Sequence, residues 1–375
     1  MNRHSLKMYL SSNGRHVNRY FLGLLLLILT LGTLAFFSAS FGLLSRDGPP
    51  FSSVIKSQVI YGLLPGLLAA YVFSKIHYAL WRKVALYGLI FAIFLNLLLL
   101  IPELSFEHGG AVRWLKIGSY TFQPSEFLKI AFILYLASWL STTKEKLKDV
   151  KFGILPFILI LGVTVTLLII QRDTDTAVVL STTALIMYFA AGARIKDILI
   201  VMAICAFGLV GLFFTRPYLM DRMQVFLNPS HDPAKSGYQV TQSLVAIGSG
   251  QLVGRGFGQS IQKYSRLPEP IGDSIYAVIG EEFGFLGSVF IIVLFFILAV
   301  LGMRISIRAP DSFGRLTVLG IVIMITVQSF VNMASMLGLI PISGLPLIFV
   351  SQGGTSLLAA LAAVGIVLNV SRYSK

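Results

Sequence analysis

The chain has 375 residues, of which 56% are hydrophobic and 12% are charged. Its mean hydropathy is +0.82. Soluble domains carry about 25% charged residues, so the composition excludes a soluble domain. The formal net charge is +14, yet no nucleic-acid partner is expected, because the basic residues gather in loops between apolar stretches. The single cysteine, Cys205, allows no intrachain disulfide.

Apolar stretches recur along the chain, each close to the ~20 residues that a helix needs to cross a bilayer. Each is expected to be helical, because hydrocarbon offers no partner to a free backbone N–H or C=O group. The predicted fold class is all-α: a polytopic integral membrane protein of about ten transmembrane helices, forming a single membrane domain over residues 1–375. The expected spans are residues 21–41, 53–73, 84–101, 125–140, 153–170, 177–192, 198–215, 276–302, 316–338 and 348–369.

The distribution of Lys and Arg predicts the orientation of these spans. One set of alternate loops holds 18 Lys and Arg and the other holds 11, six of them in a single long loop. Cytoplasmic loops carry the excess of positive charge, and long loops count less in this comparison. Both termini are therefore expected to be cytoplasmic, and the long loop, residues 216–275, extracytoplasmic.

Polar residues lie in the outward loop before the fourth span and at the start of the span itself. Arg113 and Trp114 form either an interfacial anchor or a site for a lipid phosphate, since arginine offers a planar fork to phosphate oxygens. Pro124 indicates a helix start. Glu126 and Lys129 follow at i, i+3 spacing, so they can pair on one helix face. The pair is either structural or one wall of a substrate cavity.

The hairpin between the fifth and sixth spans, Gln171–Thr176, contains Asp173 and Asp175, which are interpreted as a polar turn that satisfies the helix ends. The long loop holds several prolines, so it is not one continuous helix. Its segment Tyr238–Ile247 is amphipathic and suits a helix lying along the membrane surface.

Three carboxylates mark the point where the chain returns to the membrane: Asp273, Glu281 and Glu282. Crowding of carboxylates in a desolvated place raises at least one pKa, which suits a general base. The last outward connection, GLIPISGLPLIFVSQGGTSLL, mixes proline and glycine with apolar residues. It predicts that the tenth span starts as a broken helix beside a cavity, since irregular backbone at membrane depth needs protein or water around it.

Nucleotide, nicotinamide and zinc motifs are absent from the sequence. Four segments instead resemble one family, in the family's order. They are RWLKIGSYTFQPSEFLK at 113–129, YQVTQSLVAIGSGQLVGRGFGQSIQK at 238–263, LPEPIGDSIYAVIGEEFGFLG at 267–287 and PISGLPLIFVSQGGTSLL at 341–358. Together they resemble SEDS proteins, the bacterial shape, elongation, division and sporulation proteins typified by FtsW and RodA. The stretch GQSIQKYSRLPE is closer to the division type.

The resemblance implies a peptidoglycan glycosyltransferase that polymerises lipid II, a disaccharide peptide on undecaprenyl pyrophosphate, at the outer face of the bacterial cytoplasmic membrane. It implies a class B penicillin-binding protein as partner, with other divisome or elongasome membrane proteins, and a divalent cation, Mg or Mn, whose ligands the sequence does not show. No organic cofactor is expected. The resemblance makes the carboxylate of Asp273 the catalytic group. It gives these candidate substrate-binding residues: Arg113, Trp114, Glu126, Lys129, Gln242, Lys263 and Glu281.

The chain departs from the family pattern in three places. The hairpin reads QRDTDT where the family reads QPDxGT, so Arg172 and Asp175 replace Pro and Gly. Gln352 replaces the Tyr before the late Gly-Gly, and Ile271-Gly272 replaces His-Thr before the catalytic acid. These departures are interpreted as lineage variation.

Three classes of function stay open at this point. The enzyme would transfer a glycosyl group with inversion, using Asp273 as base and cations such as Arg113, Lys129, Lys263 and Arg266 to neutralise pyrophosphate. A lipid II flippase would need polar groups through the full depth of the membrane, whereas the acids here gather at the outer edge, which favours the enzyme. A scaffold for division partners would not depend on any acid.

Overall fold

A computed structural model describes residues 16–45, 50–108, 111–118, 120–228 and 236–374. In this part of the chain, seven helical segments are long and apolar enough to cross a membrane. They are α2 (Arg19–Ser40) with η1 (Phe41–Ser45), the continuous run of α3 (Phe51–Ser57), η2 (Gln58–Leu63) and α4 (Leu64–Lys75), α5 (Ala79–Leu97) with η3 (Leu98–Leu100), α9 (Ile195–Thr215), α13 (Ile275–Ile307), α14 (Ser312–Met336) and α15 (Gly354–Tyr373).

Three further apolar helices complete the predicted set: α6 (Pro124–Thr143), α7 (Ile154–Ile170) and α8 (Thr174–Ala190). The predicted helical membrane fold is confirmed, and α6 begins at Pro124 as expected. The centre of the bundle is formed by α14 and α15, of which 72% and 83% of the most apolar window is buried, against 6% for α9. Helix α9 therefore offers most of its apolar surface to lipid.

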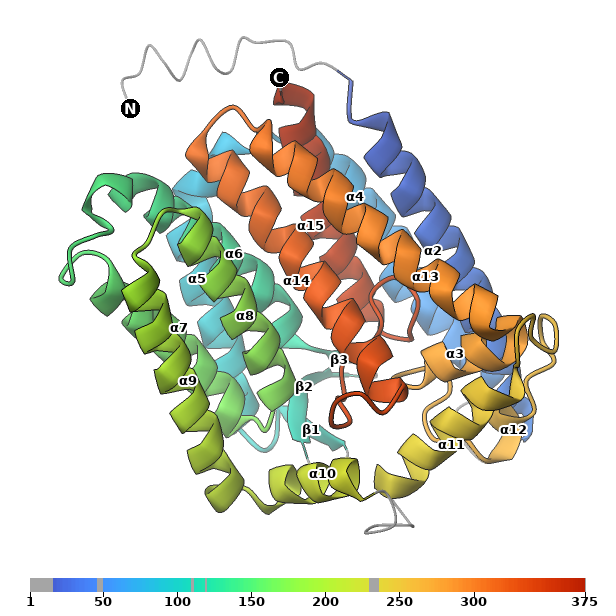
Figure 1. The fold of residues 1–375 in the computed structure, drawn as a ribbon. Helices are drawn as coiled ribbons and strands as arrows, with labels where there is room; N and C mark the ends of the chain where they lie inside the picture. Colours follow the sequence, from blue (N-terminus) through green and yellow to red (C-terminus); the bar gives the residue numbers. More distant parts are fainter. Residues whose placement is uncertain (1–15, 46–49, 109–110, 119, 229–235, 375) are drawn as a thin grey trace.

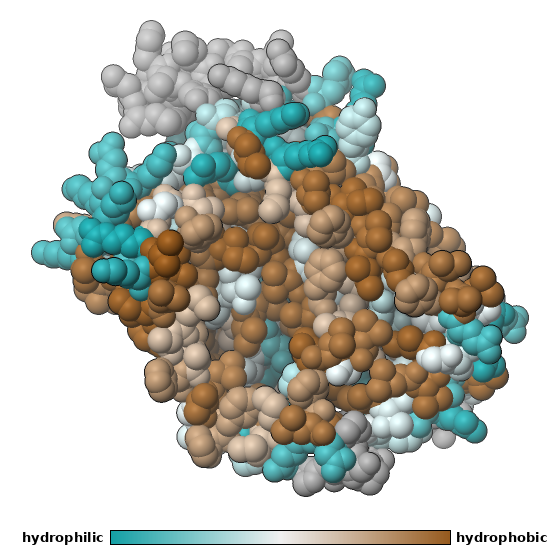
Figure 2. All heavy atoms as spheres, in the orientation of Figure 1, coloured by the Kyte–Doolittle hydropathy of each residue, from teal (hydrophilic) through white to brown (hydrophobic). Residues whose placement is uncertain are grey.

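The two ends of the bundle differ in what they carry. Figure 1 shows the start of α2 and the end of α15 at one end, and the β-strands with α10, α11 and α12 at the other. On the face shown in Figure 2, hydrophobic residues cover the middle of the molecule and hydrophilic residues gather toward the two ends. This is the distribution expected of a protein whose middle section lies in the hydrocarbon core of a bilayer.

A small antiparallel sheet precedes α6, which the all-helical prediction did not include. Its strands are β1 (Ser105–His108), β2 (Ala111–Ile117) and β3 (Tyr120–Phe122), in the order β1-β2-β3. A loop rich in alternating apolar and polar residues can satisfy its backbone in this way. The sheet is important for the site because β2 carries Arg113.

The predicted start of the tenth span, residue 348, was wrong. Residues 348–353 are not helical, and α15 begins at Gly354. The irregular connection before it is deeply buried, with Leu347 and Val350 each 1% exposed. Its backbone is held by Gln58 of η2, whose amide donates to the carbonyl of Ser351 (3.3 Å) and accepts from the amide of Gly353 (3.0 Å). The predicted irregular start of the tenth span is confirmed, and protein surrounds it.

Helix α13 is two helices joined by a kink at Gly284, whose φ of 66° lies in the left-handed region that glycine adopts without strain. The loop before it supplies the hydrogen bonds that the kink removes. The amides of Arg255 and Gly256 donate to the carbonyls of Glu281 (3.1 Å) and Glu282 (2.9 Å). On the other side of the kink, Phe285 and Leu286 donate to residues 251 and 252 of the same loop, at 2.8 and 3.1 Å.

The described part of the long loop, residues 216–228 and 236–275, contains three helices: α10 (Pro217–Leu227), α11 (Ser236–Ser249) and α12 (Gln262–Ser265). The helix predicted over Tyr238–Ile247 is confirmed by α11, which packs against α13. Val240 on this helix is buried, whereas Leu244 is 42% exposed. Two of the expected loop prolines, in residues 229–235, lie outside the described residues.

Candidate active site

Asp273 lies in the last turn before α13, and its backbone is fixed from the core of the bundle. The side-chain amide of Asn332 on α14 donates to the carbonyl of Asp273 and to that of Leu345, each at 2.8 Å. The hydroxyl of Ser351 donates to the carbonyl of Gly272 at 2.8 Å. Since these partners come from α14 and the buried 341–353 connection, the position of Asp273 is set by the most rigid part of the fold.

Arg113 enters the site from β2 and joins the hairpin between α7 and α8. Its Nη2 donates to the carbonyl of Arg172 at 2.7 Å, and its Nε lies 3.4 Å from Oδ1 of Asp173. Its Nη2 is also 3.9 Å from Oδ2 of Asp175. Burial lowers the pKa of Arg113, but Asp173, Asp175 and Asp273 together raise it above its usual value. The guanidinium is therefore a permanent positive charge here.

Arg222 adds a second cation from the long loop. Its Nη1 on α10 donates to both carboxylate oxygens of Asp175, at 3.1 and 3.0 Å. Asp175 also accepts from the backbone amide of Gly344 at 3.1 Å. The sheet, the hairpin, α10 and the last connection are thus joined around one carboxylate.

Gly344 marks the point where these groups converge. A β-carbon at this glycine would lie 3.4 Å from Nη1 of Arg113 and 3.7 Å from an oxygen of each of Asp175 and Asp273. A β-carbon would therefore fit there without a clash, so the missing side chain leaves a methyl-sized space beside these three groups. A substrate atom placed there would contact a base and a cation at once.

The environment of Asp273 raises its pKa to about 7. Burial is the largest cause, and the negative charges of Glu269 and Asp175 add to it, while Arg113 and Arg222 act in the opposite direction. A raised pKa is present at Asp273 as expected, but its largest cause is burial and its acidic neighbours are Glu269 and Asp175. The predicted crowding of Asp273 with Glu281 and Glu282 was wrong. A carboxylate with a pKa near the working pH is suited to general-base catalysis.

The predicted pair of Glu126 and Lys129 is present on α6, with Nζ 3.0 Å from the carboxylate. The two residues are 3% and 1% exposed. Lys129 also donates to Gln328 on α14 at 2.7 Å, and Gln328 donates to the carbonyl of Pro346 at 3.2 Å. The pair therefore connects α6 and α14 to the 341–353 connection that helps hold Asp273.

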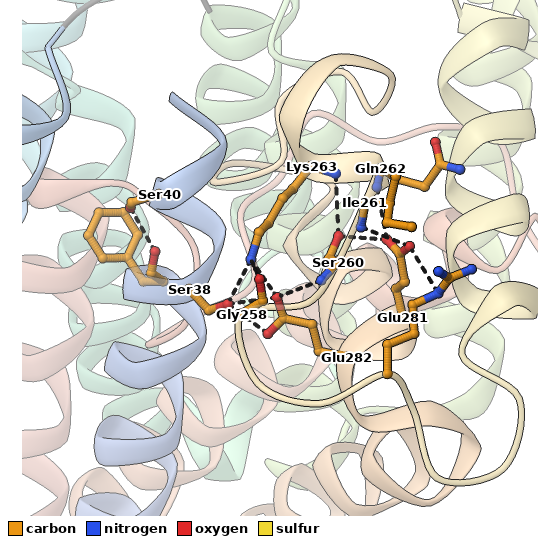
Figure 3. A network of polar contacts seen from close by, with 11 residues as sticks. Ser38, Ser40, Gly258, Ser260, Ile261, Gln262, Lys263, Glu281 and Glu282 are labelled. Carbon is orange, nitrogen blue, oxygen red and sulfur yellow. Dashed lines mark hydrogen bonds and ion pairs between the residues drawn. The ribbon is translucent and has the colours of Figure 1, made fainter. Parts of the chain in front are cut away.

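Lys263 and Glu282 form a separate buried ion pair, shown in Figure 3. Their Nζ and carboxylate are 2.7 Å apart, and they are 0% and 1% exposed. Ser38 on α2 donates to the same carboxylate at 2.7 Å. The structure thus joins Lys263 to α2 and α13.

Glu281 anchors the loop before α12 in the same region (Figure 3). Its carboxylate accepts from the hydroxyl of Ser260 at 2.6 Å and from the amides of Ile261 and Gln262 at 3.0 and 3.2 Å. Arg255 lies 3.5 Å from it. The three expected acids therefore do not form one cluster, because Glu281 and Glu282 bind the loop on the other side of α13's first turns.

Two further predicted residues lie apart from the charged groups. Trp114 follows Arg113 on β2, so it points to the opposite face of the strand, where it pairs with Phe106. Gln242 is partly buried on α11. The residue one turn before it, Gln239, donates to Ser274 at 3.1 Å, which places α11 directly beside the segment that carries the base.

Comparison with known proteins identifies the family. The family of cell cycle proteins that groups FtsW, RodA and SpoVE has a model that matches residues 18–375. This chain belongs to that family. The resemblance noted from the sequence is thereby confirmed.

Family members with curated names match over most of the chain. Stage V sporulation protein E of Bacillus subtilis is 38% identical over 350 residues, which are 93% of this chain and 95% of that protein. A probable peptidoglycan glycosyltransferase FtsW of Geobacter sp. (strain M18) is 40% identical over 317 residues, covering 84% and 86% of the two chains.

Solved structures of the family share the fold. A chain from a peptidoglycan synthase complex, studied for the coordination of polymerization and crosslinking, matches with a TM-score of 0.78 at 25% identity, covering 96% of this chain and 99% of that one. The rod shape determining protein RodA of Thermus thermophilus matches with a TM-score of 0.69 at 25% identity, over 96% and 98%. The 40% identity to a protein named FtsW, compared with 25% to RodA, agrees with the predicted closeness to the division type.

Several site residues of this family member were not predicted from its sequence. Asn332 and Gln328 are polar, fully buried and one helical turn apart on α14. That spacing of two amide side chains in an apolar span is a signal in the sequence, although neither residue is ionisable. Arg222 and Gln239 could not be recognised from the residues around them in the sequence, because the partner of each comes close only when the loop folds.

The described part of this family member contains no group of three or more His, Cys, Asp or Glu side chains that could hold a metal ion. The acids near Asp273 are instead paired with Arg113 and Arg222. These residues do not fit a protein-bound divalent cation.

Proposed function

We propose that the chain is a peptidoglycan glycosyltransferase that polymerises lipid II at the outer face of the cytoplasmic membrane, with Asp273 as general base. The observation that carries this is a carboxylate with a pKa of about 7, held by buried backbone contacts beside two arginines. Relatives named as probable peptidoglycan glycosyltransferases support the assignment.

The reaction requires one proton transfer and one exchange of bonds. A hydroxyl of the acceptor sugar loses its proton to the Asp273 carboxylate and attacks the anomeric carbon of the donor from the face opposite the leaving group. The new glycosidic C–O bond forms as the bond from that carbon to pyrophosphate breaks, which inverts the configuration. Undecaprenyl pyrophosphate departs with the bonding electrons, and Asp273 releases its proton to water.

The leaving group needs positive charge, because pyrophosphate gains an anionic oxygen when the bond breaks. Arg113 and Arg222 are the cations nearest the base, and Arg113 is the one that borders the open space at Gly344. The divalent cation that the resemblance implies has no three-ligand site among the described residues. We therefore propose that such an ion arrives on the substrate's pyrophosphate, which predicts loss of synthesis in a chelator without loss of the protein's thermal stability.

The buried pair favours the enzyme over a lipid II flippase. A headgroup path needs polar groups that water and substrate can reach, whereas Glu126 and Lys129 are 3% and 1% exposed and each is bonded within the protein. Their contacts instead support the 341–353 connection behind Asp273. A flippase has no use for a base at the outer edge.

The orientation of the enzyme in the membrane and its partners are also proposed. The start of α2 and the end of α15 lie at the end of the bundle opposite α10, α11 and α12 (Figure 1). The set of alternate loops with fewer Lys and Arg, 11 against 18, is assigned to the outside, and it includes the long loop. A class B penicillin-binding protein is the proposed partner, because a neighbour in structure belongs to a peptidoglycan synthase complex. Other divisome or elongasome membrane proteins are proposed as further partners.

The deciding experiment is synthesis of glycan strands from lipid II by the purified full-length protein, alone and with a class B penicillin-binding protein. Asp273→Asn keeps the size of the side chain but removes the basic oxygen. We expect the rate to fall by about 10²–10⁴-fold, with lipid II binding retained. Glu103→Gln, at an exposed acid, is the control and should keep the rate. A rate for Asp273→Asn within a few-fold of wild type would remove Asp273 as the base.

A further inference from the structure

Asp175 has more contacts with separate segments than a polar turn at the end of a hairpin requires. Its carboxylate binds Arg222 of α10 through both oxygens, at 3.0 and 3.1 Å. It accepts from the amide of Gly344 in the last connection at 3.1 Å and lies 3.9 Å from Nη2 of Arg113 on β2. One side chain of α8 therefore holds three segments that are far apart in the sequence.

The same carboxylate is close to the base. Oxygens of Asp175 and Asp273 each lie 3.7 Å from the point where a β-carbon of Gly344 would be. The two oxygens are therefore no further apart than twice that distance. At such a separation two like charges influence each other's ionisation.

We propose that Asp175 is a positioning residue for glycosyl transfer: it fixes α10 and the Gly344 connection against the base and controls the charge state of Asp273. The proposal rests on the proposed function, in which Asp273 must be ionised to act. Asp175 does not touch substrate in this role. It acts through Asp273 and through the open space that Gly344 leaves.

The electrostatic consequence has a definite sign. The charged groups that influence Asp273 are Glu269 and Asp175, which raise its pKa, and Arg113 and Arg222, which lower it. Removing the charge of Asp175 should lower the pKa of Asp273, so the base becomes active at lower pH. Removing the charge of Arg222 should have the opposite effect. If Asp175 were only structural, the variants at Asp175 and Arg222 would have no reason to shift the pKa of Asp273 in opposite directions.

The test is the pH dependence of glycan synthesis from lipid II by the full-length protein with a class B penicillin-binding protein present. In Asp175→Asn the midpoint of the acidic limb should move down by about one pH unit, and in Arg222→Gln it should move up by a similar amount. Asp175→Glu keeps the charge and should restore the wild-type midpoint. Glu103→Gln, at an exposed acid outside the site, should leave the profile unchanged.

The outcomes separate this proposal from the proposed function. Lower rates at every pH with an unmoved midpoint in both variants would show that Asp175 is only structural. If Asp175→Asn does not fold, Arg222→Gln alone decides, and an unmoved midpoint there overturns the proposal. An active Asp273→Asn enzyme would instead refute the base itself. An inactive Asp273→Asn enzyme with unmoved midpoints refutes only the role of Asp175.

Discussion

Replacing Lys263 with methionine tests whether this lysine serves substrate or structure. Its ammonium group is 0% exposed and lies 2.7 Å from Glu282, which is 1% exposed. The substitution would leave the carboxylate buried without its cation. Breaking one partner of such a pair costs about 3–5 kcal/mol. Since the hydroxyl of Ser38 still donates to Glu282, we expect a loss near the lower end, about 3 kcal/mol.

The double variant Lys263→Met/Glu282→Gln removes both charges and should recover most of that loss, because a buried pair can be replaced by neutral groups of similar size at little cost. Arg255→Gln is a matched control. Its side chain is 39% exposed and 3.5 Å from Glu281, so removing it should cost less than about 1 kcal/mol.

Unfolding in mixed micelles of detergent and SDS measures the free energy, and lipid II polymerisation measures function on the same samples. The single variant should be unstable and the double variant both stable and active. A double variant that is stable but makes no glycan would refute this reasoning. Lys263 would then serve the pyrophosphate, as the family resemblance implies.

Three further predictions concern the site and the topology. Folding raises the pKa of Asp273 from 3.8 to about 7, so the folded state loses stability as the pH rises from about 4 to about 7, and the whole loss is present above pH 7. Asp273→Asn should therefore raise the melting temperature at pH 8, and the gain should shrink as the pH falls from 7 toward 4, whereas a gain equal at all pH values contradicts the raised pKa. The double variant Glu126→Gln/Lys129→Met should melt close to wild type yet synthesise glycan more slowly, and full synthesis would make the pair purely structural. In a cysteine-free background, Val253→Cys should react with an impermeant thiol reagent added outside intact cells and Lys148→Cys should not, and the reverse pattern would invert the orientation.

The helices could be predicted because each depends on properties of its own residues. A span must be apolar over its whole length, and Pro124 must begin a helix rather than continue one. The Glu126–Lys129 pair was equally local, since i, i+3 spacing on a helix brings two side chains together whatever the rest of the fold does. Asp273 was found as one of three acids where the chain returns to the membrane, and the family motif then distinguished it from Glu281 and Glu282.

The partners of the base were not predictable in the same way. Arg113, Asp175 and Arg222 come from a strand, a hairpin and a loop helix that meet only in the folded protein. Sequence spacing carries no information about such contacts. The acids at Glu281 and Glu282 show the converse error: nearness along the chain suggested a common cluster with Asp273. Asp273 lies before α13 begins, however, and Glu281 and Glu282 lie about two helical turns further along.

The kink at Gly284 has a consequence for how the protein is made. A break in a membrane helix leaves amide and carbonyl groups that lipid cannot satisfy. Here their partners lie at residues 251–256, about thirty positions earlier in the chain. Because the ribosome makes that loop first, it precedes the helix into the translocation machinery, and the broken helix meets its hydrogen-bonding partners as soon as it emerges.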